Sequence, residues 1–115
     1  MTKIVCVCGS SRADGSLEQM IERAAASARV AGAEVRELYL RDTSLPVMIW
    51  GDEAQAELGS VIEVRELAAW ADGFVLGTPE YHGCMSGALK NWFDFLYGEL
   101  AGKFAGVLAL SLIHI

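Results

Sequence analysis

Two polar loops contain the residues of this sequence that are suited to binding a charged ligand. The first, Gly9 to Ser16, includes Ser10, Arg12 and Ser16. Backbone amides at a helix start, hydroxyl groups and an arginine together favour a phosphate group. The spacing of Gly9 and Gly15 does not fit the dinucleotide motif G-x-G-x-x-G, and no lysine stands where a P-loop requires one. The loop therefore predicts a mononucleotide phosphate site, with an ordinary strand-to-helix connection as the alternative.

Both polar loops follow predicted buried strands. Residues 4–8 and 74–76 are apolar without alternation, as in parallel strands covered by helices on both faces. In such sheets ligands bind beyond the carboxyl ends of strands, where the winding direction reverses. We therefore expect the first loop and the second, Pro79 to Gly87, to face one crevice.

Three helices are predicted from apolar residues at helical spacing. The first begins at Ser16, with Gln19 as its capping partner, and ends before Gly32. The second opens in the same way at Ser60 and Glu63. The third follows Gly87 and presents the core residues Leu89, Trp92, Phe93, Leu96 and Tyr97.

The remaining segments complete the predicted sheet. Residues 33–40 alternate charged and apolar types, which indicates an edge strand, and residues 104–110 indicate another buried strand. Residues 41–59 form a long excursion with one helical turn. Within it, Trp50 has two interpretations, as a pocket residue or as a contact that fastens the loop to the body, and we favour the second.

Composition limits the possible partners and location. The chain has 115 residues, 53% of them hydrophobic, and a net charge of −6. These values predict one acidic, folded domain and argue against nucleic acid or an anionic membrane as a partner. A cytoplasmic location is expected because the N-terminal residues have no leader pattern and no apolar run is long enough to span a bilayer. Cys6, Cys8 and Cys84 are expected to be small buried hydrophobic residues, and with only two histidines no metal site is expected.

With both loops described, the sequence resembles the flavodoxin-like NAD(P)H-dependent FMN reductases, which include quinone, chromate and azo-dye reductases. The segment from Gly9 to Arg12 and on to Ser16 resembles their G-S-x-R phosphate loop. Residues 79–83 and 87–91 resemble their P-E-Y-[NH]-G…G-x-L-K-N segment, and this second match is the more specific.

The resemblance implies an FMN site and NAD(P)H as electron donor. It implies that Ser10, Arg12, Ser16 and the amide of Leu17 hold the FMN phosphate, and that a turn wraps the flavin ring. The ring contacts are assigned to Pro79, Glu80, Tyr81, His82 and Gly83. The flavin carries the redox chemistry, so no catalytic side chain is named. An acid/base pair of Glu80 and His82 is the less favoured interpretation, and Lys90 and Asn91 are expected to support the turn.

The implied fold is a flavodoxin-like α/β doubly wound parallel sheet of strand order 2-1-3-4, spanning residues 1–110. The family's fifth strand is missing, and residues 111–115 are expected to be a non-native tail. The expected activity is reduction of FMN by NAD(P)H and electron delivery to a small-molecule quinone, azo, nitro or metal-oxyanion acceptor. A homodimer or homotetramer is expected at full length. The alternatives are a flavodoxin-type electron carrier and a fragment that no longer binds flavin.

Overall fold

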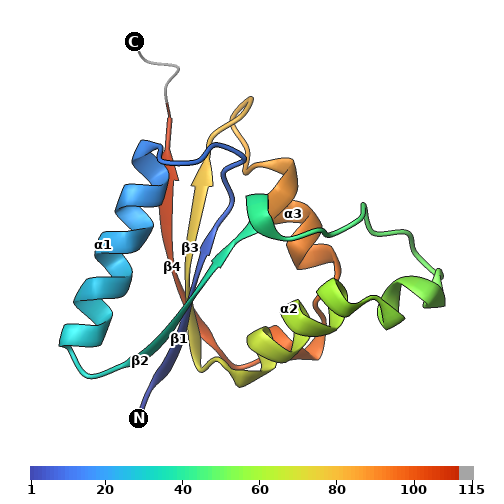
Figure 1. The fold of residues 1–115 in the computed structure, drawn as a ribbon, viewed down its shortest axis with the longest axis horizontal. Coiled ribbons are helices and arrows are strands. Elements are labelled where there is room, and N and C mark those ends of the chain that lie inside the picture. The colour runs from blue at the N-terminus through green and yellow to red at the C-terminus, as the bar shows by residue number, and fades with distance from the viewer. Residues whose placement is uncertain (112–115) are drawn as a thin grey trace.

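The computed structural model describes residues 1–111 of the chain. Strands and helices alternate along it, and the carboxyl ends of the strands lie together at the upper edge of Figure 1. The elements are β1 (Lys3–Cys8), α1 (Ser16–Val30), β2 (Glu34–Tyr39), α2 (Gly59–Trp70), β3 (Gly73–Pro79), α3 (Gly87–Asp94) and β4 (Phe104–Leu110), with short 3-10 turns at Leu40–Asp42, Glu53–Glu57 and Gly98–Leu100.

The four strands form one parallel sheet in the order β2-β1-β3-β4. Val7, near the carboxyl end of β1, has Leu38 of β2 on one side and Leu76 of β3 on the other. This order confirms the predicted doubly wound sheet, in which the winding direction reverses between β1 and β3. The loops that follow β1 and β3 therefore leave from the same point of the sheet edge.

Helices cover both faces of the sheet, which explains the uninterrupted apolar runs in β1 and β3. Helix α1 lies on one face, and α2 and α3 lie on the other (Figure 1). On the α1 face the buried cluster consists of Cys6, Cys8, Leu17, Ile21 and Ala25. On the opposite face a larger cluster includes Val5, Val7, Val64, Phe74 and Trp92. The predicted burial of Cys6 and Cys8 is confirmed, whereas Cys84 is exposed.

The two outer strands differ from each other in their exposure. Strand β2 is at the sheet edge, as predicted, with Glu34 and Arg36 exposed. Strand β4 was expected to be buried, and this is wrong for the described residues. Phe104 is 56% exposed and Val107 66% exposed. The strand pairs with β3 on one side only within residues 1–111, and α1 and α2 lie mainly over the other three strands.

Helix α2 and the excursion before it depart from the predicted capping pattern. Helix α2 begins at Gly59, and the hydroxyl of Ser60 donates a 2.9 Å hydrogen bond to the Ser44 carbonyl instead of capping the helix. Asn91 of α3 binds this excursion, because its amide donates to the Pro46 carbonyl at 2.8 Å and its oxygen accepts from the Met48 amide at 2.9 Å. The side chain of Asn91 is thus used away from the turn that it was expected to support.

Three aromatic residues lie in environments that differ from the sequence predictions. Trp50 is 82% exposed, so it does not fasten the excursion to the body; it lines a shallow cavity of about 300 Å³. Tyr97 lies beyond the end of α3 and is 55% exposed, whereas Phe95, which the helical pattern did not select, is buried. Helix α3 ends at Asp94, three residues before Tyr97, so helical spacing does not predict the position of Tyr97.

Candidate functional site

The loop after β1 has a defined conformation built on local hydrogen bonds. Ser10 is buried, and its hydroxyl oxygen accepts from the Arg12 amide at 3.0 Å. Asp14 has a φ of 55°, and its amide donates to the Glu18 carboxylate at 2.6 Å. The N-cap of α1 is Gly15, without a side-chain cap, so the predicted Ser16–Gln19 capping pair is wrong. Glu18, in the first turn of α1, instead accepts a hydrogen bond from a backbone amide of the loop before the helix.

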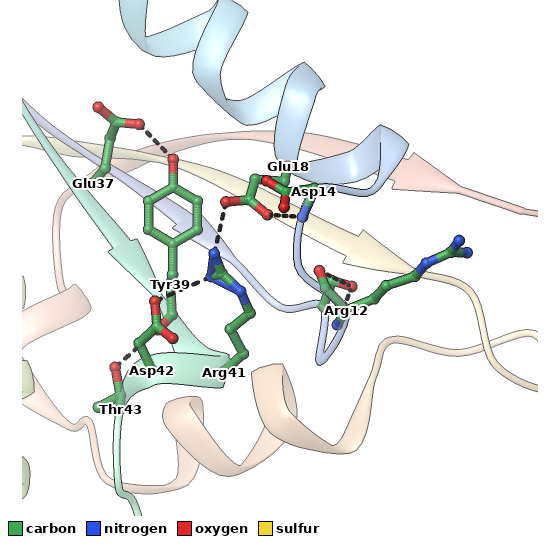
Figure 2. A network of polar contacts seen from close by, with 9 residues as sticks. Arg12, Asp14, Glu18, Glu37, Tyr39, Arg41, Asp42 and Thr43 are labelled. Carbon is green, nitrogen blue, oxygen red and sulfur yellow. Dashed lines mark hydrogen bonds and ion pairs between the residues drawn. The ribbon is translucent and has the colours of Figure 1, made fainter.

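Several donors of this loop have no protein acceptor. Within residues 1–111 the amides of Ser16 and Leu17 and the guanidinium of Arg12 have no hydrogen-bond or ion-pair partner. The stem of Arg12 lies along Gly15, where an added Cβ would be 3.7 Å from the Arg12 Cδ atom. Figure 2 shows the Arg12 side chain pointing away from Glu18. A positive helix end with free donors and a free arginine is suited to an anion.

The loop after β3 forms a tight turn. The amide of Tyr81 donates to the Cys84 carbonyl at 2.9 Å, and the Cys84 amide donates back to the Tyr81 carbonyl at 3.0 Å. The two central residues, His82 and Gly83, have φ values of 53° and 75°. Two positive φ angles define a type I′ turn, which accepts His more readily than most non-glycine residues. The turn holds Tyr81 half exposed at the sheet edge.

A buried serine joins the two loops. The Ser86 hydroxyl donates to the Gly9 carbonyl at 2.7 Å and accepts from the Leu89 amide at 3.1 Å, as the N-cap of α3. The Ser86 amide donates to the Thr78 hydroxyl at 2.9 Å. A Cβ on Gly9 would approach the Gly77 carbonyl oxygen and the Ser86 Oγ atom to 3.0 Å each, so glycine is needed at this contact. Sequence analysis missed Ser86, although a serine three residues before Leu89 is an N-cap signal.

The two loops line one cavity of about 490 Å³. Its walls include eight of the nine residues assigned to FMN by sequence: Ser10, Arg12, Ser16, Leu17, Pro79, Glu80, Tyr81 and His82. The ninth, Gly83, is not a lining residue and instead supplies the positive φ of the turn. Gly15 and Leu110 also line the cavity and were not predicted. Leu110 reaches it because its carbonyl accepts from the Glu80 amide at 2.8 Å, which places the end of β4 beside the turn.

The remaining polar residues near the turn have local partners. The Glu80 carboxylate accepts from the Ser111 hydroxyl at 3.2 Å, and no hydrogen bond joins Glu80 to His82 in the described part of the chain. Lys90 forms an ion pair with Asp94, one turn along α3, rather than with the turn. Beneath the site, burial raises the pKa of the Cys8 thiol, so this thiol stays protonated at neutral pH.

The described residues offer neither a metal site nor a membrane segment. From residue 1 to residue 111, no three His, Cys, Asp or Glu side chains gather closely enough to hold a metal ion. Over the same range no helix combines the length and the apolar character needed to cross a bilayer.

The fold and the site together define a class of protein. The sheet order places two loops at the switch point, one with free anion donors and the other with an exposed tyrosine on a rigid turn. These are the features of a flavodoxin-like α/β domain, a fold in which ligands bind at the switch point of the sheet. Residues 2–114 match the family model of NADPH-dependent FMN reductase, and the chain belongs to this family.

Individual relatives agree with this assignment. The chain is 54% identical over 62 residues to the NADPH azoreductase of Bacillus sp. (strain OY1-2), a match covering 53% of this chain and 35% of that protein. It is 34% identical over 100 residues to the NADPH-dependent FMN reductase ArsH of Shigella flexneri, covering 87% of this chain and 38% of the relative. The apo structure of the NADH:FMN oxidoreductase EMOB has a TM-score of 0.80 and 26% identity over 96% of this chain and 59% of that one.

Proposed function

We propose that the cavity between the two loops binds FMN and that the protein to which this chain corresponds is an NAD(P)H-dependent flavin oxidoreductase. The observation that carries this proposal is the pairing of unsatisfied donors with a ring-sized wall in one cavity. Arg12 and the amides of Ser16 and Leu17 come from the first loop, and Pro79 and Tyr81 come from the second. Family membership supports the same conclusion.

The residues present fit FMN by their chemistry. Arg12, the hydroxyls of Ser10 and Ser16 and the Leu17 amide would hold its phosphate, while the turn would lie against its ring. The rigid type I′ turn limits how far Tyr81 can move, so the wall is already formed before binding. When bound there, FMN would supply the redox chemistry, which is hydride uptake from a nicotinamide and electron transfer to an acceptor. The chain's own part is to bind, to orient and to shield, and no side chain is assigned a proton transfer.

The electron acceptor is proposed to be a small molecule of the quinone, azo, nitro or metal-oxyanion class. The relative named NADPH azoreductase supports the azo member of this class. A reaction that consumes NAD(P)H suits the cytoplasm, where we place the protein. A homodimer or homotetramer of the family-length protein is also part of the proposal, as is a flavodoxin-like domain over residues 1–110.

The decisive experiment is reduction of the flavin without oxygen. The protein is loaded with FMN, excess flavin is removed, and NADPH or NADH is added while absorbance at the flavin band is followed. Bleaching by the nicotinamide alone supports the reductase. Bleaching only after a separate reductase protein is added would favour an electron carrier instead. A protein that retains no FMN after desalting, and none at micromolar flavin, would contradict the proposal in this chain.

The proposed tail at residues 111–115 lies almost wholly outside the described residues, since only Ser111 is described. The expectation that the sheet continues in the family-length protein is consistent with the coverage above, because this chain spans 35% and 38% of the two curated relatives.

A further inference from the structure

A buried carboxylate shares the first turn of α1 with the proposed phosphate site. The side chain of Glu18 is 8% exposed. One of its oxygens accepts from the Asp14 amide at 2.6 Å, and the other accepts from the Arg41 guanidinium at 2.8 Å (Figure 2). A buried carboxylate is costly unless hydrogen bonds and a cation satisfy it. Its surroundings supply both.

The cation comes from a different part of the fold. Arg41 lies just after β2, at the outer edge of the sheet. Its guanidinium is 5.1 Å from the centre of the Tyr39 ring and 3.1 Å from a carboxylate oxygen of Asp42. Only 21% of its side chain is exposed. Tyr39 and Asp42 therefore both contact the guanidinium that binds Glu18. Among the described residues Arg41 is the one cation paired with the Glu18 carboxylate.

This arrangement bears directly on anion binding. The positive end of a helix carries only a partial charge, so it stabilises a limited amount of negative charge. The carboxylate of Glu18 would repel a second anion bound nearby. Arg12 does not neutralise Glu18, because its side chain points away from the pair and makes no ion pair within residues 1–111. Neutralisation of Glu18 thus depends on Arg41, while Arg12 stays free.

Glu18 also fixes the shape of the loop. It accepts the amide of Asp14, a non-glycine residue with a φ of 55°, and so stabilises the strained step immediately before the N-cap Gly15. If repulsion by an incoming phosphate displaced Glu18, that step would lose its partner. An Arg41 contact that keeps Glu18 on Asp14 therefore preserves the loop geometry as well as its charge balance.

We propose that Arg41 is a positioning residue for flavin phosphate recognition: by pairing with Glu18 it lets the N-terminus of α1 accept a dianion. This inference rests on the proposed FMN site. It assigns Arg41 no contact with the ligand. It predicts that the effect of Arg41 depends on the charge of Glu18 and on the presence of a phosphate in the ligand.

The test is a double-mutant cycle with two ligands. The parent, Arg41→Gln, Glu18→Gln and the double variant are titrated calorimetrically with FMN and with riboflavin, which lacks the phosphate. Arg41→Gln should weaken FMN by about tenfold or more, because the buried charge of Glu18 is left unopposed. Riboflavin affinity should change by less than about twofold. In the double variant FMN affinity should return to within about threefold of the parent.

A matched control uses the other end of the same helix. Arg29 forms a 3.0 Å ion pair with Glu37 near the C-terminus of α1, so Arg29→Gln removes an arginine of the same kind away from the loop. Its FMN affinity should equal that of the parent. If Arg41→Gln fails to fold in a thermal unfolding assay, Glu18→Gln decides. That variant removes the buried negative charge and leaves Arg41 paired with Asp42, so it should bind FMN at least as tightly as the parent and riboflavin equally.

Each other outcome overturns the inference. Equal loss of FMN and riboflavin affinity in Arg41→Gln would make Arg41 a support of the fold, and the proposed function would stand. A double variant as weak as Arg41→Gln, or a Glu18→Gln variant that loses FMN affinity selectively, would also overturn it. A parent that binds neither FMN nor inorganic phosphate would remove the proposed function and the inference together.

Discussion

Replacing Arg12 by alanine is the most direct probe of the proposed phosphate site. The guanidinium has no partner among residues 1–111, and its stem only lies along Gly15, so the change removes little from the folded state. A charge-assisted hydrogen bond contributes about 1.5–3 kcal/mol. Because Arg12 is exposed and its charge is screened by solvent, we expect the lower half of that range, roughly a 10- to 40-fold loss of FMN affinity.

Isothermal titration of parent and Arg12→Ala with FMN and with riboflavin measures this loss. Riboflavin should bind both proteins equally, since it offers Arg12 no phosphate. Raising the salt concentration should weaken FMN binding more in the parent than in the variant. Arg12→Lys provides the intermediate case, because it keeps the charge and loses the planar fork. Equal weakening of FMN and riboflavin in Arg12→Ala would refute the phosphate role.

Three further predictions concern the fold around the site. Ser86→Ala leaves the buried Gly9 carbonyl unpaired and should lower the free energy of unfolding in urea by about 1–3 kcal/mol; a loss no larger than that of the surface control Ser27→Ala would contradict this. Burial raises the pKa of the Cys6 thiol to about 11, so the folded protein holds this proton more tightly than the unfolded chain. The free energy of unfolding should therefore fall as pH rises from about 9 toward 11, and Cys6→Ala should flatten that fall; an unchanged slope would argue against it. Within residues 1–111 strand β4 pairs only with β3, so we expect chains to self-associate through its open edge. Val107→Lys on this exposed strand should reduce that self-association in sedimentation velocity, whereas identical distributions would show that β4 does not mediate it.

The sequence was sufficient to predict most of the fold and the walls of the cavity. Alternating buried strands and amphipathic helices indicate a parallel α/β sheet, and both loops were located by where their strands end. These signals are local in sequence. The strand order was implied by the resemblance to the flavodoxin-like reductases. The predicted burial of β4 was wrong because an apolar run shows only that a strand is suited to burial. The run does not show which element covers the strand.

The contacts that hold the site together are not local, and for that reason they were missed. Ser86 meets Gly9 across 77 positions, and Arg41 meets Glu18 across 23. Nothing in the spacing of either pair identifies the partner. The capping prediction at Ser16 failed in the same region, since Gly15 takes the N-cap position and Glu18 satisfies the loop amide instead. Propensity marks where a helix begins to within a residue or two, whereas the identity of its cap depends on the surrounding loop.

The Ser86 hydroxyl also fixes the distance between the two loops of the site. In the proposed function the first loop binds the phosphate of FMN and the turn binds its ring, so the two loops contact opposite ends of the ligand. Once either end is bound, the other arrives at an effective concentration set by how far the loops drift apart. The 2.7 Å bond from Ser86 to Gly9 restrains that drift. The binding free energy of FMN should therefore be more favourable than the sum of the binding free energies of inorganic phosphate and of a flavin ring without phosphate. Loosening this one bond should lower the affinity for the whole molecule while leaving the affinity for either half unchanged.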